Sequence, residues 1–224
     1  MAKVKKQSKK SLAAKSPEQI KEAYINFVLE HERKPANVFK FCKTLGIGED
    51  VFYQSFSSFK ALEKAIWKGY ASETIDRLKA DGNYTKFTSR EKILAFYFTL
   101  VEVLRANRSF VVLKISNWKP VTVAPSFLKK FKTEFEQWAE EVIEEGKATA
   151  EIARRPYLDK RYVSLLWLHL SFILKFWSHD DSTDFEKTDE AIEKSVNLAF
   201  DVIGKGLIDN AFEFGKFLYQ QRKF

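Results

Sequence analysis

Glycine and proline are scarce in this chain, which has eight glycines and five prolines in 224 residues. All-β proteins use these residues at one hairpin after another, so their scarcity disfavours a turn-dense sheet and favours helices. Cysteine occurs once, at Cys42, and a single cysteine forms no disulfide within the chain. No secretory signal pattern opens the sequence. We therefore expect a soluble, cytoplasmic protein.

No apolar run has the length of a membrane span. The densest apolar stretch, from Tyr162 to Trp177, is interrupted by polar residues that include His169 and Lys175. It is also shorter than the roughly 20 apolar residues that a membrane-spanning helix needs. We interpret this stretch as a buried helix and expect no membrane partner.

Residue patterns that mark enzymes and metal sites are also missing. The only histidines are His31, His169 and His179, and no two of them have the spacing of zinc ligands. The sequence contains neither a P-loop nor a dinucleotide-binding glycine pattern. Cys42 falls on an apolar helix stripe, where a small buried hydrophobe is a better interpretation than a reactive thiol. The sequence predicts no enzyme, no cofactor and no metal site.

Positive charge is unevenly distributed. The chain has 38 basic and 30 acidic residues, a net charge of +8. Six of its lysines stand in residues 1–16, which contain no acid, so the remainder is almost neutral. This segment has too few apolar residues to fold alone, and we interpret it as a basic, flexible arm. It either adds DNA contacts without sequence preference or is a solvated tail.

Helix caps and apolar stripes predict a helix-turn-helix unit over residues 17–62. Ser16, Pro17 and Gln19 form a strong helix start, and the first apolar stripe ends near His31. Asn37 is placed to cap a second helix, which Gly46 ends. A third short helix is expected at residues 51–56, and a fourth begins after Ser57-Ser58.

Residues 63–224 are predicted to form a larger helical body. A capping box at Thr88-Ser89-Arg90-Glu91 starts a helix that is apolar almost all round and is therefore central. Further helices are expected from about Ser126 to Glu145, from about Pro156 to Trp177, and from about Phe185 to Tyr219. The last stripe holds for seven turns despite Gly204, Gly206 and Gly215, where close approach of another backbone would explain a glycine.

The segment FCKTLGIGEDVFYQSFSSFKAL, residues 41–62, resembles the signature of the TetR/AcrR-type helix-turn-helix regulators. The matching positions are Phe41, Gly46, Ile47, Tyr53, Phe56, Ser58 and Leu62. The similarity covers about 60 residues, and the remainder matches the family only in helical character and length. It implies an all-α fold, with an N-terminal helix-turn-helix three-helix unit followed by a C-terminal helical bundle.

The departures from the family pattern fall on the side of the unit that faces DNA. Gly48 stands where the family has a serine cap, Val51 replaces a threonine, and Phe59 replaces a lysine that contacts phosphate. Glu49 and Asp50 complement the helix dipole but repel phosphate unless a nearby lysine compensates.

The resemblance implies a transcription regulator, a homodimer that binds a near-palindromic operator in double-stranded DNA through its third helix. We expect Tyr53 and Lys43 to contact phosphate and Gln54 and Thr44 to contact base edges. The full set of expected DNA-binding residues is Asn37, Lys43, Thr44, Glu49, Tyr53, Gln54 and Lys60. The alternative is a TetR-fold ligand- or lipid-binding protein that has lost operator recognition. A basic surface around Tyr53 would favour the first interpretation, and a neutral or acidic surface the second.

We also expect residues 63–224 to bind a ligand and to form the dimer. Aromatic residues are plentiful there, and a small apolar or aromatic ligand is the expected partner, oriented by His169. The expected ligand-binding residues are Phe96, Leu100, Trp118, Phe135, Trp138, Trp167 and His169. The last two long helices of each chain would form a four-helix interface with two-fold symmetry. The expected interface residues are Leu165, Phe172, Phe176, Val196, Phe200 and Ile203.

Overall fold

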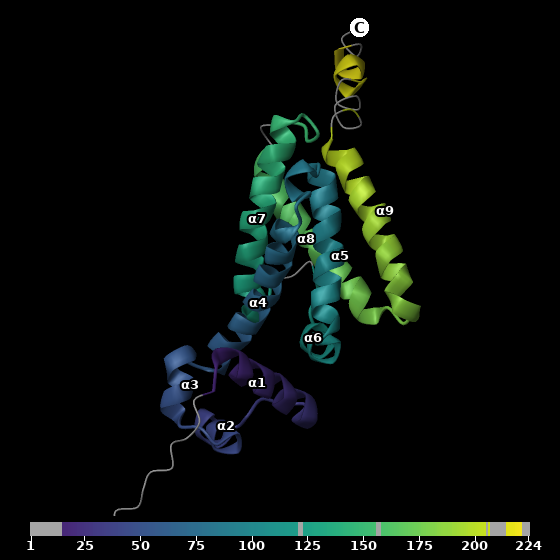
Figure 1. Ribbon diagram of the computed structural model, residues 1–224. Coiled ribbons are helices and arrows are strands. Elements are labelled where there is room, and N and C mark those ends of the chain that lie inside the picture. Colours follow the sequence, from purple (N-terminus) through teal and green to yellow (C-terminus); the bar gives the residue numbers. More distant parts are fainter. Residues whose placement is uncertain (1–14, 121–122, 156–157, 205, 207–213, 221–224) are drawn as a thin grey trace, which may run out of the picture. The chain divides into compact units, whose positions relative to one another are not determined.

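The computed structural model describes residues 15–120, 123–155, 158–204, 206 and 214–220, and these residues form helices and no strand (Figure 1). The expected all-α fold is confirmed. The chain divides into two compact units, and the boundary lies between Ile66 and Trp67. The basic arm expected at residues 1–16 lies almost wholly outside the described residues.

The first unit contains α1 (Pro17–His31), α2 (Val38–Leu45), α3 (Glu49–Ser55) and the beginning of α4 (Phe59–Ala80). The predicted caps are present: the Ser16 hydroxyl accepts a hydrogen bond from the backbone N–H of Gln19 at 3.3 Å, and the Gln19 side chain accepts one from Ser16 in return. Asn37 caps α2 by accepting from the backbone N–H of Lys40 at 2.8 Å. Gly46 ends α2 with a φ of 68°, a left-handed conformation that glycine adopts at little cost.

Phe41 is the centre of the core of the first unit. Its side chain is buried, and its ring contacts those of Tyr24 on α1, Phe52 on α3 and Phe59 on α4. The Tyr24 hydroxyl donates a hydrogen bond to Glu63 Oε1 at 2.7 Å, which joins α1 to α4. The packing therefore fixes the orientation of α3 within this unit.

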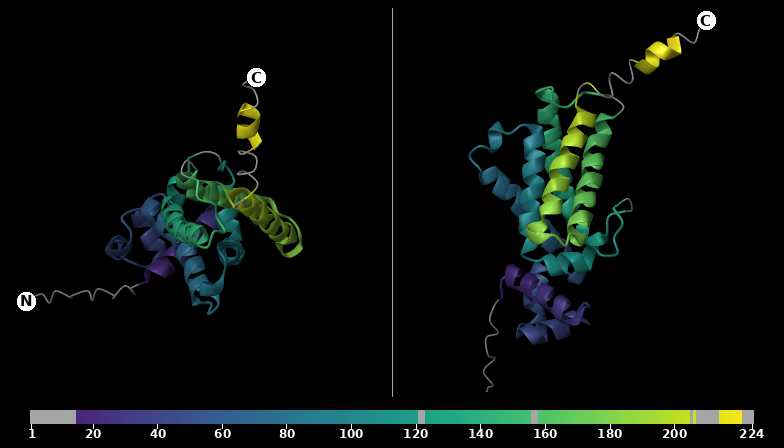
Figure 2. Two further views of the ribbon diagram at one scale, coloured as in Figure 1. Left: turned by 90° about the horizontal axis from the view of Figure 1, so that it is seen from above. Right: turned by 90° about the vertical axis from the view of Figure 1, so that its right-hand side faces the viewer.

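The second unit contains the remainder of α4, followed by α5 (Ser89–Arg105), α6 (Arg108–Ile115), α7 (Lys129–Ala148), α8 (Tyr162–His179) and α9 (Glu186–Ile203). Short 3-10 turns, η1 to η4, lie at Tyr84–Lys86, Ser126–Leu128, Asp159–Arg161 and Thr183–Phe185. Helix α5 packs against α6, α7, α8 and α9, and α8 lies beside α9 (Figure 2). The prediction of a central helix after Thr88 is confirmed, since Phe96, Leu100 and Leu104 are fully buried.

Three helix predictions need correction. Helix α6 was not expected, and α8 begins at Tyr162, while Pro156, its expected start, lies outside the described residues. The prediction of a final helix of seven turns is wrong, because α9 ends at Ile203 and Gly204 is extended. The expected stripe positions between residues 207 and 213 lie outside the described residues, and Phe214 and Leu218 are exposed.

Contacts from a distant segment explain why α9 ends there. The Arg155 guanidinium donates to the carbonyls of Ile203 at 3.3 Å and Gly204 at 2.8 Å. A Cβ atom at residue 204 would lie 2.6 Å from the Phe200 carbonyl oxygen and 3.4 Å from that of Glu151. The atom that excludes a side chain here is thus the Phe200 carbonyl oxygen of α9 itself, while Glu151 lies at ordinary contact distance, so the close approach of another backbone that the sequence suggested is not the reason for this glycine.

Candidate functional site

A tight turn joins α2 to α3. The backbone N–H of Ile47 donates to the Cys42 carbonyl at 3.1 Å, and that of Gly46 donates to the Lys43 carbonyl. Phe52 points into the core of the unit, so the next two residues of α3, Tyr53 and Gln54, are exposed. The turn therefore presents one face of α3 to solvent, as a helix-turn-helix reader requires.

Most of the expected DNA-binding residues surround this exposed face. Lys43, Thr44 and Lys60 are exposed, and Glu49 is half-buried. The Thr44 hydroxyl donates to the Phe41 carbonyl at 2.7 Å within α2. Asn37 is exposed, but its side-chain carbonyl oxygen already caps α2. Only the side-chain amide N–H groups of Asn37 are therefore left to bind DNA.

The electrostatic character of this face is close to neutral. Glu49 and Asp50 occupy the first turn of α3, which has no side-chain cap. The Asp50 carboxylate folds back over Gly48, within 2.1 Å of where a Cβ atom at that position would lie. Lys40, Lys43 and Lys60 are exposed on the same stretch of chain and oppose the two acids.

Cys42 behaves as the buried hydrophobe that its position on the stripe indicated. It is 1% exposed. Burial raises the pKa of its thiol, and the carboxylates of Glu49 and Asp50 raise it further. The thiol is therefore protonated and inaccessible at neutral pH, which is unfavourable for a nucleophile.

The aromatic residues that were expected to line a ligand cavity form a packed cluster in the second unit. The Phe96 ring stacks on Trp138 with centroids 4.4 Å apart and lies 5.3 Å from Phe135, whose ring also contacts Trp167. Trp118 packs against Trp167 in turn. These rings fill the space at this position by packing against one another, as side chains do in a close-packed protein core.

The same cluster contains buried polar groups that lack hydrogen-bond partners among the residues described. Within the described part of the chain, the indole N–H groups of Trp67 and Trp118 and the hydroxyl of Tyr70 are buried without a hydrogen-bond partner. The Trp67 and Tyr70 rings contact each other on α4. Burial, together with the Glu73 carboxylate, raises the pKa of Tyr70, so its hydroxyl stays protonated.

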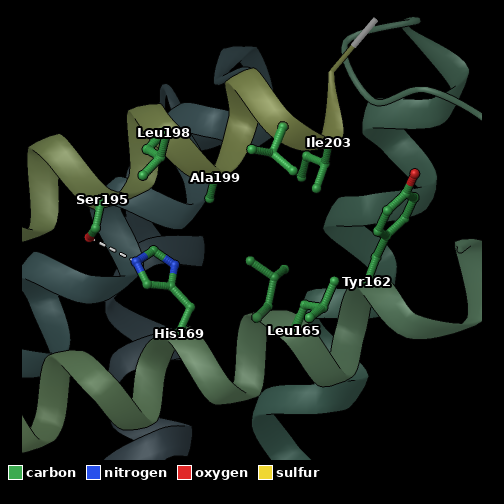
Figure 3. Close-up of a pocket in the computed structure, with 9 residues that line it drawn as sticks. Tyr162, Leu165, His169, Ser195, Leu198, Ala199 and Ile203 are labelled. Carbon is green, nitrogen blue, oxygen red and sulfur yellow. Dashed lines mark hydrogen bonds between the residues drawn. The ribbon is translucent and has the colours of Figure 1, made fainter. Parts of the chain in front are cut away.

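A cavity of about 290 Å³ lies between α8 and α9 (Figure 3). Helix α8 contributes Tyr162, Leu165, Leu166 and His169 to its wall. Helix α9 contributes Ser195, Leu198, Ala199, Val202 and Ile203. Of the expected ligand-binding residues, His169 is the one that lines this cavity.

His169 joins three helices at one end of the cavity. Its Nε2 lies 2.8 Å from the Ser195 hydroxyl on α9, and its Nδ1 lies 3.3 Å from the Tyr97 hydroxyl on α5. Burial lowers the pKa of His169 to about 4, so the imidazole is neutral at pH 7. The cavity therefore has a polar but uncharged end.

The outer face of α8 and α9 corrects part of the expected dimer interface. Leu165 and Phe172 are about half exposed, and Phe176 is half-buried. Val196, Phe200 and Ile203 are buried within their own chain and offer a partner little surface, and Ile203 lies in the wall of the cavity. The exposed apolar residues beside the first set are Leu168, Leu198 and Val202.

The sequence contained a signal for the residues that were missed. Ser195, Leu198, Ala199 and Val202 follow one another at helical spacing and form a second stripe beside the buried one. Two adjacent stripes on one helix indicate an apolar face wider than a single neighbour covers. Which stripe is buried depends on how α8 packs against α9, and the spacing alone does not contain that information.

Within the described ranges, no cluster of three or more histidine, cysteine, aspartate or glutamate side chains could hold a metal ion. The helices there also lack the combination of length and apolar character that crossing a membrane requires.

Residues 92–218 match the family described as tetracyclin repressor-like, C-terminal domain. Among curated proteins, none matches this chain. Solved structures of similar fold include a TetR family transcription regulator from Shewanella sp. PV-4, with 13% identity and a TM-score of 0.61 over 84% of this chain and 98% of that one.

Two further structures of similar fold are regulators named FadR. The fatty acid degradation regulator FadR from Bacillus halodurans has 15% identity and a TM-score of 0.62, covering 86% of this chain and all of that one. The regulator FadR from Bacillus subtilis, solved in complex with stearoyl-CoA, has 14% identity and a TM-score of 0.57 at the same coverage. At such identities the likeness shows the fold.

Proposed function

Because this chain belongs to the TetR family of transcription regulators, with more than half of its length matched, we propose that it binds double-stranded DNA as a homodimer under the control of a small apolar ligand. The observation that carries the proposal is the exposed face of α3, where Tyr53 and Gln54 stand clear of a core organised around Phe41. The fold supplies the scaffold, and the exposed side chains supply the contacts.

Each exposed residue has a contact suited to its chemistry. Tyr53 and Lys43 bind phosphate, which fixes register without reading sequence. Gln54 and Thr44 reach base edges, and glutamine pairs best with adenine in the major groove. Because the face of α3 is nearly neutral, much of the affinity must come from the lysines of residues 1–16.

The salt dependence of DNA binding tests this division of roles. Each neutralised phosphate adds about 0.9 to the slope of log affinity against log salt. Removing residues 1–15 should flatten the slope and leave the preferred sequence unchanged, whereas Tyr53→Ala should weaken binding to every sequence. Ser55→Ala, an exposed neighbour on α3, is the matched control. A chain whose whole affinity disappears with the arm would show that α3 does not read DNA.

The homodimer would form on the exposed apolar face of α8 and α9, defined by Leu165, Leu168, Phe172, Leu198 and Val202. Contiguous apolar surface of this kind marks an interaction site. Two such helices from each of two chains build a symmetric four-helix interface.

Light scattering tests the dimer. The chain has a mass of 26.1 kDa, so twice that mass is expected at micromolar concentration. Leu198→Lys should return the protein to the monomer mass, because a charge there would be buried in the interface. Val123→Lys, at an apolar residue that is 89% exposed and on neither helix, is the control. A wild-type chain of monomer mass would exclude the dimer.

A second function is favoured by the two acids at the start of α3. Glu49 and Asp50 oppose phosphate, and the surface around Tyr53 is not the basic one that operator binding prefers. The alternative is a TetR-fold protein that binds a ligand or lipid and no operator. The Bacillus subtilis FadR holds stearoyl-CoA, so the fold accommodates an acyl chain. Absence of any enriched DNA sequence would favour this alternative.

A further inference from the structure

We propose that the cavity between α8 and α9 binds an uncharged, mainly apolar molecule that carries one hydrogen-bonding oxygen, and that a second copy of the chain closes the cavity. The inference deepens the proposed function, because it rests on the proposed dimer and names the chemical class of the ligand. It places that ligand at the outer face of the unit rather than among the packed aromatic rings.

The wall of the cavity explains the apolar part of the ligand. Leucine, valine, isoleucine, alanine and the ring of Tyr162 make up all of it except one end. A volume of about 290 Å³ is at the small end of the range for ligand sites, roughly 300–1,000 Å³. The cavity therefore suits a short alkyl chain or a single ring system.

The polar end explains the oxygen. A serine hydroxyl has one hydrogen to donate and two lone pairs that accept. The pairing of Ser195 with His169 Nε2 (Figure 3) and a longer bond that the hydroxyl donates to the Ile192 carbonyl at 3.4 Å use two of these capacities and leave one lone pair. A ligand hydroxyl at that end of the cavity can therefore donate to Ser195 without breaking either bond.

The absence of charge along the cavity sets the ligand's charge. No lysine, arginine, aspartate or glutamate is among the lining residues, and His169 is neutral at pH 7. The Arg155 guanidinium lies behind the opposite end of the cavity (Figure 3), where it donates to the Tyr162 hydroxyl and the Ile203 carbonyl. A carboxylate or ammonium group at the Ser195 end would be buried without a partner, which is strongly unfavourable. The cavity thus selects an alcohol over the corresponding carboxylate.

The mouth of the cavity couples binding to the dimer. Leu165, Leu198 and Val202 line the cavity and are also exposed on the face proposed to pair. A molecule in the cavity of a single chain would stay partly in water, whereas the second copy would cover it. A ligand that binds the dimer better than the monomer shifts the equilibrium towards the dimer.

Nuclear magnetic resonance of the histidine ring nitrogens tests the site directly. The chain has three histidines, and His31 and His179 are exposed, so the buried His169 is readily distinguished. Octanol should shift the His169 signals at pH 7, and octanoate at the same concentration should not. Equal binding of octanol and octanoate, or His169 signals unmoved by octanol, would overturn the proposal.

Two variants separate the cavity from the interface. Ser195→Ala should weaken octanol binding about fivefold, the effect of one neutral hydrogen bond, and leave octane binding unchanged. Leu168→Ala, on the same exposed face but outside the cavity wall, should leave the preference for octanol over octanoate intact. A preference for octanol over octane that survives Ser195→Ala would contradict the role of the hydroxyl.

Analytical ultracentrifugation with and without octanol measures the coupling between ligand binding and dimerisation. Octanol should tighten the dimer severalfold, and a dimer that dissociates in octanol would show that a partner side chain, not a ligand, fills the cavity. Failure of this inference is distinguishable from failure of the proposed function. If the protein selects a DNA palindrome but does not bind octanol, the ligand site is rejected and the proposed function stands. If it binds octanol but selects no DNA sequence, operator binding is rejected and the ligand site stands.

Discussion

Tyr24→Phe should unfold the first unit at a lower denaturant concentration while leaving the second unit intact. The Tyr24 hydroxyl donates to Glu63 Oε1 at 2.7 Å, and Glu63 is 3% exposed. Removing the donor takes one hydrogen bond to a charged group away from this carboxylate, and the ion pair with Lys34 Nζ, 3.6 Å away on an exposed side chain, adds little stability. A hydrogen bond to a charged group contributes about 1.5–3 kcal/mol, and that is the loss expected.

The chain itself provides the assay, because all five tryptophans lie at or beyond Trp67, in the second unit. Urea unfolding followed by circular dichroism reports both units, and tryptophan fluorescence reports the second. The variant should therefore show an early dichroism transition that fluorescence does not follow. Tyr53→Phe, an exposed tyrosine in the same unit, should show none.

Glu63→Gln completes a double-mutant cycle. The amide oxygen can still accept from Tyr24 in the single variant, so the two substitutions should not be additive, and their coupling measures how much the charge on Glu63 strengthens the hydrogen bond. A loss below about 0.5 kcal/mol for Tyr24→Phe, the range of ordinary surface changes, would refute the reasoning.

Three further outcomes are expected. Tyr70→Phe should leave the melting temperature unchanged or raise it, because the hydroxyl has no hydrogen-bond partner among the described residues. Tyr97→Phe removes hydrogen bonds to Leu166 and His169 and should lower the free energy of unfolding by about 1 kcal/mol. An equally large loss for Tyr70→Phe would contradict this. Burial alone would raise the pKa of Asp180, but hydrogen bonds from Ser182 and Thr188 outweigh burial and lower the pKa to about 2. The stability that the ionised carboxylate contributes is complete above about pH 4 and is lost as the pH falls towards 2. Asp180→Asn should remove this pH dependence from acid-unfolding curves. Gln54→Ala should change the preferred DNA sequence, measured by competition between operator variants, and an unchanged preference would exclude Gln54 as a base contact.

Helix starts were predictable from the sequence because their causes are local. Ser16 with Gln19, and Thr88 with Glu91, form capping boxes from side chains three residues apart. The left-handed Gly46 likewise depends only on its own backbone freedom. The turn before α3 followed from these, whereas the role of α3 came from the resemblance of residues 41–62 to a known family.

The end of α9 and the identity of its outer face were not predictable, because distant residues decide both. Arg155 and the backbone N–H of Ala153 both bind the Ile203 carbonyl and stop the helix there, although its apolar spacing continues. An apolar stripe shows which residues share a face and does not show which neighbour covers them. Val196 was therefore assigned to the interface and is buried, while Leu198, two positions along, is exposed.

Selection of binding sites from random duplex DNA by the full chain tests the central claim most directly. We expect enrichment of a near-palindrome whose half-sites lie about one helical turn, roughly 34 Å, apart, because two copies of α3 read it together. Enrichment of the same sequence should survive removal of residues 1–15, whereas Tyr53→Ala should lower the affinity for all sequences alike. A selection that enriches no sequence would contradict operator recognition by α3.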